Sequence, residues 1–316
     1  MLNCSIIIRA YNEEKHLGRL LEGLLHQTVK DVEVILVDSG SSDSTISIAQ
    51  SFGSQIIHIP ADEFTFGRSL NLGIQAASND YVVIASAHVY PVYPDWLECL
   101  LRPFDNQNVA LAYGKQRGSE TSKFSERLIF RQWFPDVDSP RQPGPFCNNA
   151  NAAVRKSLWE RHAYDETLTG LEDIEWAKWA QSEGWAVSYV TQAEVVHIHD
   201  ETGQGVQNRY RREAMAFKRI FPESHFNIYD FVRLTLTNIV SDLSSATRPG
   251  VKAGNLASIF SFRLNQFWGT YQGYRHSSSV TPYLRQTFYY PHRMESRKEL
   301  ERGIQPIRYN QGDRKE

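Results

Sequence analysis

The sequence has 316 residues, of which 41% are hydrophobic, 22% charged and 12% aromatic. This composition excludes collagen-like, coiled-coil and low-complexity proteins and favours a globular protein with a sizeable core. Its longest apolar runs, such as residues 82–85, fall far short of the roughly 18 residues that a membrane-spanning helix needs. The first residues also lack a basic and apolar leader, so we expect a cytoplasmic protein. Three widely spaced cysteines, Cys4, Cys99 and Cys147, argue against a disulfide framework or a zinc finger.

Charge divides the chain into two regions. The net charge is −2, yet residues 1–204 carry 16 basic and 27 acidic side chains, whereas residues 205–316 carry 18 and 9. We therefore expect an α/β domain over 1–204 and a basic extension over 205–316. Basic charge alone does not choose between nucleic acid, anionic lipid and a diphosphate ligand. Because no nucleic-acid motif accompanies it, we expect no nucleic-acid partner.

The first 113 residues alternate between short apolar strands and amphipathic helices. Leu17 to Leu25 have helical spacing, for example, and follow a β-branched run at 5–9. Such alternation predicts a mostly parallel, Rossmann-like sheet flanked by helices, with the loops after the strands converging on one crevice. The expected strands are 5–9, 33–37, 55–59, 81–85 and 109–113, and the expected helices are about 17–25, 43–52, 68–77 and 94–104.

Beyond residue 113 the pattern loosens. Residues 114–144 hold three prolines and two aromatic-basic clusters, which predicts a long irregular excursion that could contact a second substrate. We then expect a helix containing Arg155 and Lys156, another containing Glu175 and Trp179, and strands at 186–190 and 195–199. The tail reads as helical over 209–220, 229–243 and 256–273.

Three motifs stand in a fixed order along the chain. They are Ile6-Ile7-Ile8-Arg9-Ala10-Tyr11-Asn12-Glu13-Glu14, Val34-Ile35-Leu36-Val37-Asp38-Ser39-Gly40-Ser41-Ser42-Asp43-Ser44-Thr45 and Gly170-Leu171-Glu172-Asp173. In this order and spacing they resemble family 2 glycosyltransferases of GT-A fold, with a bacterial rhamnosyltransferase-like or cell-envelope polysaccharide character. The resemblance covers about residues 3–200. It implies an inverting transfer of a hexosyl or rhamnosyl unit from a nucleotide-diphosphate donor to an acceptor hydroxyl.

Several residues are candidates for donor binding. An Asp at a strand end can accept from the N3–H of uracil or thymine, and an aromatic side chain can cover the base, so Asp38 and Tyr11 fit a UDP or dTDP donor as the resemblance suggests. Arg68 matches a family position near the nucleotide, and Asn149 lies in an amide-rich loop that can bind sugar hydroxyls. Each also has a structural alternative: turn capping, surface packing or a solvated helix start.

The expected metal site departs from the family pattern. Where the family usually places Asp-x-Asp, this chain has Ser86-Ala87-His88. The change disfavours magnesium, which prefers oxygen ligands, and leaves metal dependence open. His88 with His197 or His199 could bind manganese or another cation, or protonated histidines and arginines could neutralise the diphosphate directly.

The catalytic base is assigned by resemblance. Asp173 would deprotonate the acceptor, with Glu172 as its partner, at the start of a helix whose dipole favours ionised carboxylates. The structural alternative is a pair that only caps the helix.

Features of the tail limit the function further. A Gln-x-x-Arg-Trp motif, typical of processive polymer synthases, is absent, so we expect single transfers to a saccharide or lipid-linked acceptor in polysaccharide or glycolipid synthesis. Residues 228–243 and 260–274 read either as core or oligomer-interface helices or as amphipathic helices that place the protein peripherally on the inner membrane face. The alternative function is a non-catalytic nucleotide-sugar binder or scaffold with a degenerate metal site. A nucleotidyltransferase is disfavoured because no glycine-rich triphosphate loop follows the first strand.

Overall fold

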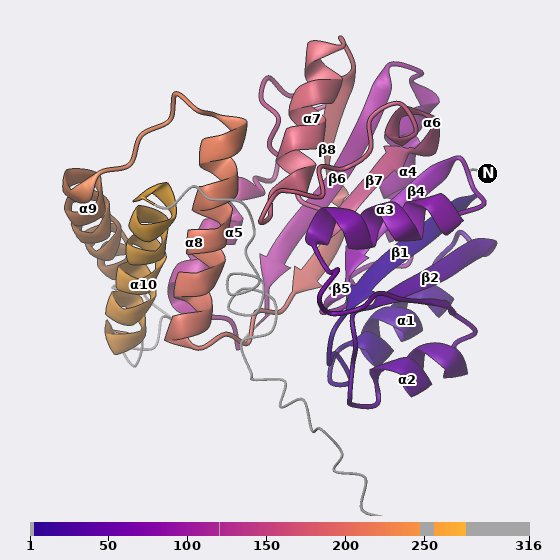
Figure 1. The fold of residues 1–316 in the computed structure, drawn as a ribbon, viewed down its shortest axis with the longest axis horizontal. Coiled ribbons are helices and arrows are strands. Elements are labelled where there is room, and N and C mark those ends of the chain that lie inside the picture. The colour runs from indigo at the N-terminus through magenta and orange to yellow at the C-terminus, as the bar shows by residue number, and fades with distance from the viewer. Residues whose placement is uncertain (1–2, 120, 247–255, 276–316) are drawn as a thin grey trace, which may run out of the picture.

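The computed structural model describes residues 3–119, 121–246 and 256–275, and these contain one eight-stranded sheet with helices on both faces (Figure 1). The strand order is β3-β2-β1-β4-β7-β6-β8-β5. The strands are β1 (Cys4–Ala10), β2 (Val32–Asp38), β3 (Gln55–His58), β4 (Tyr81–Ser86), β5 (Val89–Pro91), β6 (Val109–Gly118), β7 (Asn151–Arg155) and β8 (Ala186–His197).

The first half of the sheet confirms the predicted alternation of strands and helices. β3, β2, β1 and β4 are all parallel to their neighbours in this half. The helices between them are α1 (Leu17–Leu25), α2 (Thr45–Ser51) and α3 (Phe66–Ala76). Because Ala10 pairs with Asp38 and Arg9 with Ser86, the carboxyl ends of three strands lie along one edge. The loops after these strands therefore start side by side.

The second half of the sheet is mixed rather than parallel. β7 runs antiparallel to both β4 and β6, and the short β5 runs antiparallel to β8. The helix predicted to contain Arg155 and Lys156 is confirmed only for Lys156, because Arg155 ends β7 and the helix is the short α6 (Lys156–Trp159). A short, fully buried apolar run has no periodicity that distinguishes a strand from a helix. The two strands expected at 186–190 and 195–199 form the single strand β8, and His199 lies beyond its end.

The excursion expected at 114–144 contains a helix that the sequence pattern did not reveal. β6 continues to Gly118, and α5 (Phe124–Trp133) follows with Phe124, Ile129 and Phe130 buried. The other helices of this half are α4 (Trp96–Leu101), continued by a 3-10 turn at Arg102–Asp105, and α7 (Glu172–Ser182). α5 thus adds an aromatic wall beside the end of β6.

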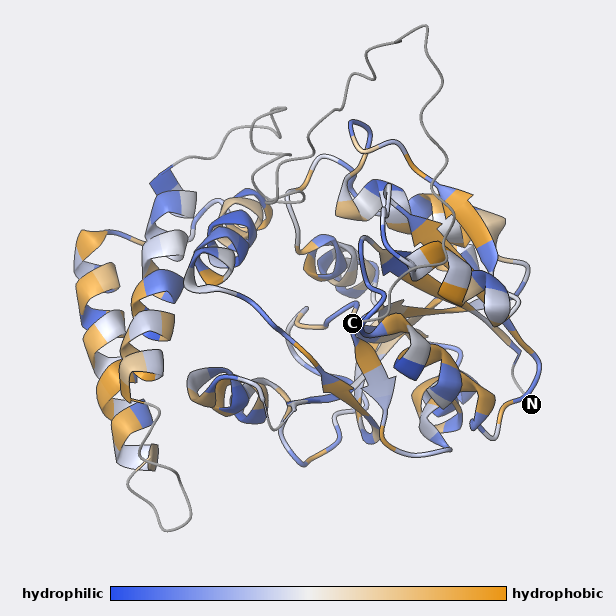
Figure 2. Cartoon of the chain, turned by 90° about the horizontal axis from the view of Figure 1, so that it is seen from below, coloured by the Kyte–Doolittle hydropathy of each residue, from blue (hydrophilic) through white to orange (hydrophobic). Residues whose placement is uncertain are grey.

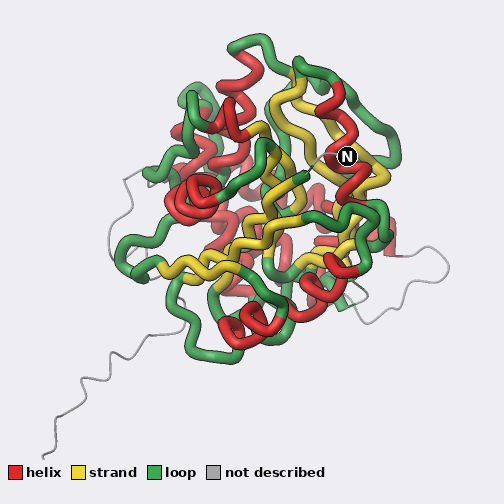
Figure 3. The backbone as a smooth tube through the Cα atoms, turned by 90° about the vertical axis from the view of Figure 1, so that its right-hand side faces the viewer, coloured by secondary structure: helices red, strands yellow, loops and turns green. Residues whose placement is uncertain are grey.

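Core residues lie on both faces of the sheet. Ile7 and Trp176 belong to one buried cluster, and Ile6, Ile8 and Trp96 belong to the other. Successive residues of a strand point to opposite faces, so β1 supplies both clusters. Figure 3 shows the strands enclosed by helices on either side. The rigid sheet between two packed layers fixes the positions of the loops at its edge.

Three helices complete the described chain and confirm the predicted helical extension. They are α8 (Gly203–Ile220), α9 (Ile228–Ala246) and α10 (Leu256–Arg275). α8 lies between the sheet and the pair formed by α9 and α10 (Figures 1 and 2). Among the described residues no helix has the length and apolar character to span a membrane.

The sequence left two interpretations of these helices open, core or interface helices and amphipathic surface helices. The α9–α10 pair has both buried and exposed apolar residues. Ile239 and Ile259 are buried, whereas Leu236, Val240 and Leu264 are more than half exposed. Core packing therefore explains only one side of these helices. Contact with a membrane surface or with another subunit remains a prediction for the other side.

Candidate active site

A cavity of about 310 Å³, here called the central cavity, opens at the carboxyl ends of β4 and β8. Side chains from α5, the start of α7 and α8 close it. It adjoins a second hollow, lined by the loops after β1 and β2, through His88, His199 and Glu201, which line both. The predicted convergence of these loops is confirmed, since the backbone N–H of Asn12 donates to Ser41 Oγ (2.9 Å) and His88 Nδ1 lies 2.8 Å from Glu13 Oε1.

Two carboxylates lie at the start of α7, inside the central cavity. Glu172 and Asp173 are both buried, and Leu171 before them has the left-handed backbone conformation (φ 58°) that turns the chain into the helix. Asp173 accepts hydrogen bonds from the backbone N–H groups of Asn149 (2.9 Å) and Ile174 (2.8 Å). Glu172 accepts from Arg9 Nη1 at 3.1 Å. The pair lines the cavity, and its contacts go beyond capping of α7.

The environment of Asp173 shifts its ionisation toward neutral pH. Burial is the main cause and the negative charge of Glu172 the second, and together they raise the pKa of Asp173 to about 7. The hydrogen bonds from Asn149 and Ile174 and the charge of Arg9 oppose this shift. A carboxylate with a pKa near neutrality can accept a proton from an alcohol more readily than an ordinary aspartate can.

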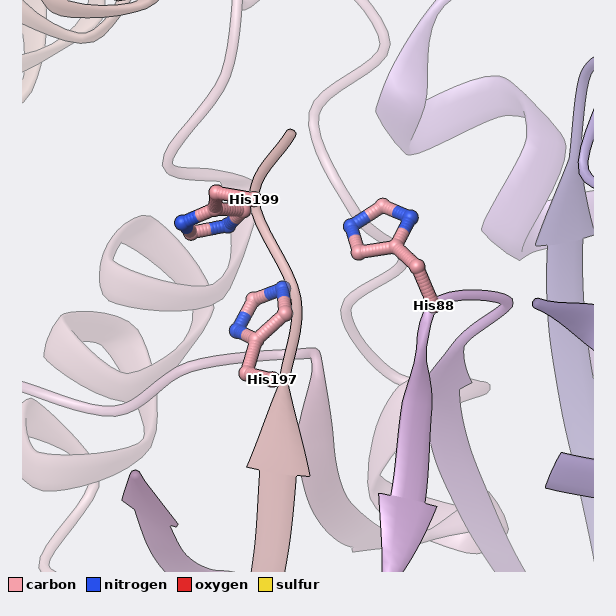
Figure 4. Close-up of side chains that lie close together, drawn as sticks. All are labelled: His88, His197 and His199. Carbon is pink, nitrogen blue, oxygen red and sulfur yellow. The ribbon is translucent and has the colours of Figure 1, made fainter. Parts of the chain in front are cut away.

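Three histidines meet at the junction of the central cavity and the adjoining hollow (Figure 4). His88 comes from the turn after β4, His197 from the last residue of β8 and His199 from the segment beyond it. One ring nitrogen of each can be chosen so that all three lie within 4.8 Å of one another. The predicted grouping of these residues is therefore present in the structure.

An oxygen atom faces the Nδ1 atom of each histidine. Nδ1 of His197 lies 2.8 Å from Gln116 Oε1, and Nδ1 of His199 lies 2.7 Å from Glu126 Oε1. Glu13 faces Nδ1 of His88 in the same way. Because these oxygens accept hydrogen bonds, they favour a proton on Nδ1 and leave the lone pair on Nε2, which in His88 lies 3.0 Å from the hydroxyl oxygen of Ser86. Metal-binding histidines commonly have this arrangement of outer oxygens.

Burial keeps two of these imidazoles neutral. It lowers the pKa of His197 well below its usual value, with His199 and His88 adding to the effect. It also lowers the pKa of His199, and Arg209 contributes in the same direction. Neutral imidazoles keep a lone pair for a cation, and imidazole suits manganese or zinc better than magnesium. These residues therefore fit a divalent transition metal.

Buried polar atoms without a hydrogen-bond partner gather around the central cavity. Among the described residues that line it, these atoms are Gln116 Nε2, Glu126 Oε2, His197 Nε2 and Arg212 Nε. Buried polar groups are nearly always hydrogen-bonded in folded proteins. Four such atoms around one cavity indicate a site whose polar ligand completes their hydrogen bonding.

Two arginines and an aromatic ring form one wall of the cavity. The guanidinium carbons of Arg9 and Arg212 each lie 4.5 Å from the ring centre of Phe66. All three residues line the cavity. The stacked ring fixes two cations near the carboxylate pair, and the wall therefore offers positive charge to an anionic group.

The residues predicted to bind the nucleotide lie outside the central cavity. Asp38, at the end of β2, is buried and accepts hydrogen bonds from the backbone N–H groups of Gly40 (3.0 Å) and Ser41 (3.2 Å). Arg68 pairs with Glu63 and Glu166. Tyr11 packs against the core at the same sheet edge. Their roles in nucleotide binding remain predictions.

Asn149, the remaining predicted donor residue, does line the central cavity. Its side chain is buried, with Nδ2 lying 3.5 Å from Glu172 Oε1. Its backbone N–H holds Asp173. The structure therefore links Asn149 directly to the carboxylate pair, and its contact with a sugar remains a prediction.

Sequence reasoning missed several cavity residues. Arg9 lies within the first of the three motifs, but only the fold reveals that its side chain reaches Glu172 on α7. Gln116 and Glu126 fall in the segment that was expected to be irregular. The buried apolar positions of α5 were the one signal that could have placed Glu126 on a helix. Arg212 lies in the tail, which the charge count had set apart.

Comparison with known proteins identifies the family. Residues 5–162, half of the chain, match the family described as Glycosyl transferase family 2. The O-antigen chain rhamnosyltransferase WbaN of Salmonella anatum is 27% identical over 197 residues, which cover 58% of this chain and 62% of that protein. The O-antigen chain rhamnosyltransferase RfbN of Salmonella typhimurium is 23% identical over 222 residues, covering 66% of this chain and 70% of RfbN.

Solved structures show the same fold. The mannosyltransferase PcManGT from Pyrobaculum calidifontis, solved with GDP-Man and Mn²⁺, has a TM-score of 0.58 at 15% identity, over 85% of this chain and 86% of that one. TarS residues 1–349 from S. aureus, solved with UDP-GlcNAc, has a TM-score of 0.51 at 15% identity, over 84% and 73%. The fold is GT-A, and the chain belongs to glycosyl transferase family 2.

Proposed function

We propose that this protein is an inverting glycosyltransferase that moves a sugar from a nucleotide-diphosphate donor to an acceptor hydroxyl. The observation that carries the proposal is the buried carboxylate of Asp173, with a pKa raised to about 7, inside a cavity with unpaired polar atoms. Membership of family 2 supports it. The two O-antigen rhamnosyltransferases favour a rhamnosyl or hexosyl donor and a saccharide acceptor in polysaccharide or glycolipid synthesis.

The order of the sites suggests how the donor lies. The nucleotide would occupy the hollow beside the loops after β1 and β2, near Tyr11 and Asp38, with UDP or dTDP as the favoured donors. Its diphosphate would lie at the three histidines, and its sugar would enter the central cavity. The anomeric carbon would then lie between the histidines and the carboxylate pair, which line the same cavity.

The reaction needs one proton acceptor and one stabilised leaving group. Asp173 takes the proton of the acceptor hydroxyl while that oxygen forms a bond to the anomeric carbon. The bond from this carbon to the diphosphate oxygen breaks, and the nucleotide diphosphate leaves with the electron pair. Attack from the opposite face inverts the anomeric configuration. Arg9 holds Glu172 and adds positive charge near Asp173.

The histidines would hold a divalent cation through Nε2. Such a cation would supply charge neutralisation for the leaving diphosphate. Gln116, Glu126 and Glu13 orient the three rings. The hollow on the nucleotide side has five carboxylates, from Glu13, Glu14, Asp43, Asp200 and Glu201, and one lysine. An acidic hollow repels a diphosphate unless a cation is present, which supports metal dependence with manganese favoured over magnesium.

A donor panel tests the proposal. UDP-, dTDP-, GDP- and CMP-sugars are added with and without Mn²⁺, and the melting temperature and the release of nucleotide are measured. We expect UDP- or dTDP-sugars to raise the melting temperature only with Mn²⁺. A ligand at 100 times its Kd stabilises the folded protein by about 2.7 kcal/mol. Slow nucleotide release by the wild type but not by Asp173→Asn supports an enzyme. Binding without release or transfer would favour a non-catalytic nucleotide-sugar binder.

A further inference from the structure

A third hollow, here called the basic groove, shares part of its wall with the central cavity but has no lining residue in common with the acidic hollow. Its volume is about 480 Å³, and the end of β6 and one face of α5 line it. Four of its side chains are cationic, Lys115, Arg117, Arg127 and Arg131, and Asp136 is its single carboxylate. The groove therefore has the opposite charge to the hollow where the nucleotide is expected.

Acidic neighbours neutralise only two of these cations. Lys115 Nζ lies 2.6 Å from Asp136 Oδ1 and 3.7 Å from Glu194 Oε2, and Arg117 Nε lies 2.6 Å from Glu194 Oε1. Within the described ranges, no ion pair forms to Arg127 or Arg131 at 4.0 Å or less. The groove is left with an excess of two positive charges.

The two unneutralised arginines belong to one helix face. Arg127 and Arg131 are four residues apart on α5, so their side chains lie one turn apart. Like charges at this spacing destabilise a helix. Guanidinium groups bind phosphate oxygens in bidentate geometry, and an anion between the two would turn the repulsion into two charge-assisted interactions.

The groove shares a wall with the central cavity. Gln116, Phe130 and Phe134 line both. Gln116 is almost fully buried, its Oε1 faces His197, and its Nε2 has no partner in the described chain. A buried amide N–H₂ at this wall is a donor for a polar ligand that reaches from one hollow to the other.

The central cavity therefore borders both of the other hollows. The acidic hollow shares His88 and His199 with the central cavity, and the central cavity shares Phe130 and Phe134 with the basic groove. If the donor occupies the acidic hollow, the basic groove is the neighbouring hollow that stays open to the acceptor. Trp133 also lines the central cavity, is 40% exposed and can stack on the face of a sugar ring, whereas Phe130 is buried against His199.

We propose that the basic groove binds a phosphate or diphosphate group carried by the acceptor, while the acceptor sugar lies against the aromatic side chains of α5. This inference rests on the proposed sugar transfer. The anionic group could belong to a lipid-linked saccharide or to a soluble sugar phosphate. Both present the same oxygens to Arg127 and Arg131, and the experiment separates them by the apolar chain.

The test compares Arg127→Gln/Arg131→Gln with a matched control, Arg161→Gln/Arg233→Gln. The control removes two exposed arginines that line none of the three hollows. Calorimetric titrations use inorganic pyrophosphate and geranyl diphosphate in EDTA, which removes any cation that would hold a diphosphate at the histidines. Because removing the like-charged pair relieves repulsion, the double variant should melt no lower than the wild type.

We expect the double variant to bind both probes at least about tenfold more weakly, because each charged hydrogen bond contributes roughly 1.5–3 kcal/mol. The control variant should bind both probes as the wild type does. Tighter binding of geranyl diphosphate than of pyrophosphate indicates a lipid-linked acceptor, and equal binding indicates a soluble one. Both probes should raise the KM of the acceptor without raising that of the donor. Unchanged affinity in the double variant would overturn the proposal, as would competition with the donor.

These results are distinguishable from failure of the proposed function. Loss of probe binding in the double variant, with no transfer or nucleotide release from any donor, would leave an anion site in a protein that is not a glycosyltransferase. The acceptor assignment would then be wrong. Transfer at the wild-type acceptor KM in the double variant would confirm the enzyme and contradict the groove.

Discussion

The two sides of the crevice differ in how far the protein satisfies its own polar groups. On the side of β1 and β2, the carboxylate of Asp38 is held by Gly40 and Ser41, and both terminal nitrogens of Arg68 pair with glutamates, so that only its Nε lacks a partner in the described chain. On the side of β8, α5 and α8, buried atoms of Gln116 and His197 have no partner within the described chain. Polar groups on the first side, here called the frame side, mostly bind one another, whereas several on the second side need a ligand to complete their hydrogen bonding.

This comparison locates the chemistry. Groups that are already hydrogen-bonded contribute mainly to the shape and stability of the loops where the nucleotide is proposed to bind. Groups left unpaired in a buried cavity carry a desolvation cost that a bound ligand can remove. Substitutions on the second side should therefore affect transfer more than stability, and substitutions on the first side should affect both.

The largest effect is expected for Asp173→Asn. The amide cannot accept the acceptor proton, so kcat should fall by about 10²–10⁴-fold while donor binding persists. Steady-state transfer and donor titration measure the two quantities. Glu175→Gln, on the same helix but in contact with His162, is the control and should keep wild-type activity. Transfer by Asp173→Asn near the wild-type rate would show that another group is the base.

The next effect concerns the histidine cluster. His197→Ala removes one imidazole and should abolish detectable Mn²⁺ binding, measured by electron paramagnetic resonance. Glu126→Gln keeps the ring but weakens the acceptor that orients His199, and should lower metal affinity by about 10–100-fold. His162→Ala, a histidine outside the central cavity, is the control. If all variants had the same Mn²⁺ affinity, the three histidines would not be the Mn²⁺ site.

The pH dependence sharpens the assignment of the base. Charged or titratable groups around Asp173 are Glu172, Arg9, Cys147 and Tyr164, and burial raises the pKa values of the last two, which stay neutral. Because the pKa of Asp173 is raised to about 7, the active carboxylate forms as pH increases, and kcat should rise with pH and level off above about 7. Single-turnover rates between pH 5 and 9 measure this. A rate that falls over the same range would contradict the base assignment.

A smaller effect is expected on the frame side. Asp38→Asn weakens the turn at Gly40 and Ser41, so it should lower stability by roughly 1 kcal/mol. If the carboxylate also reads the base, the Kd of UDP should rise about tenfold, with no change for CMP. Melting curves and titration with both nucleotides separate these effects. An altered melting temperature with unchanged UDP affinity would assign Asp38 to the frame alone.

The smallest effect is expected for Arg68→Gln. Its ion pairs with Glu63 and Glu166 are more than a third exposed, and such pairs usually contribute about 0.2–1 kcal/mol. The melting temperature should therefore change little. A large loss of donor affinity in this variant would mean that Arg68 leaves its glutamates to bind the nucleotide, and that the frame side takes part in binding more than its present contacts indicate.

The same division explains what could be predicted from the sequence. The first side consists of local units, each a strand, a loop and a helix, whose apolar periods and motifs lie within about 40 residues. The start of α7 was predictable for the same reason, since Glu172 and Asp173 are adjacent in a motif. The fold class followed from these units, whereas His197 and His199, which lie on the second side, were predicted from the family resemblance.

The second side depends on contacts that no local pattern contains. His197 meets Gln116, which is 81 residues away, and Arg9 meets Glu172, which is 163 residues away. β7 is a strand because β4 and β6 flank it, whereas its own residues are equally compatible with a buried helix. The basic groove likewise exists only because α5 lies against the end of β6.

The most direct test is a crystal structure with Mn²⁺ and a non-transferable UDP-sugar, using the anomalous signal of manganese. We expect the manganese peak to be coordinated by Nε2 of His88, His197 and His199, and the carboxylate of Asp173 to face the anomeric carbon from the side opposite the diphosphate. Manganese bound away from the histidines, or a sugar outside the central cavity, would contradict the assignment of this cavity as the active site.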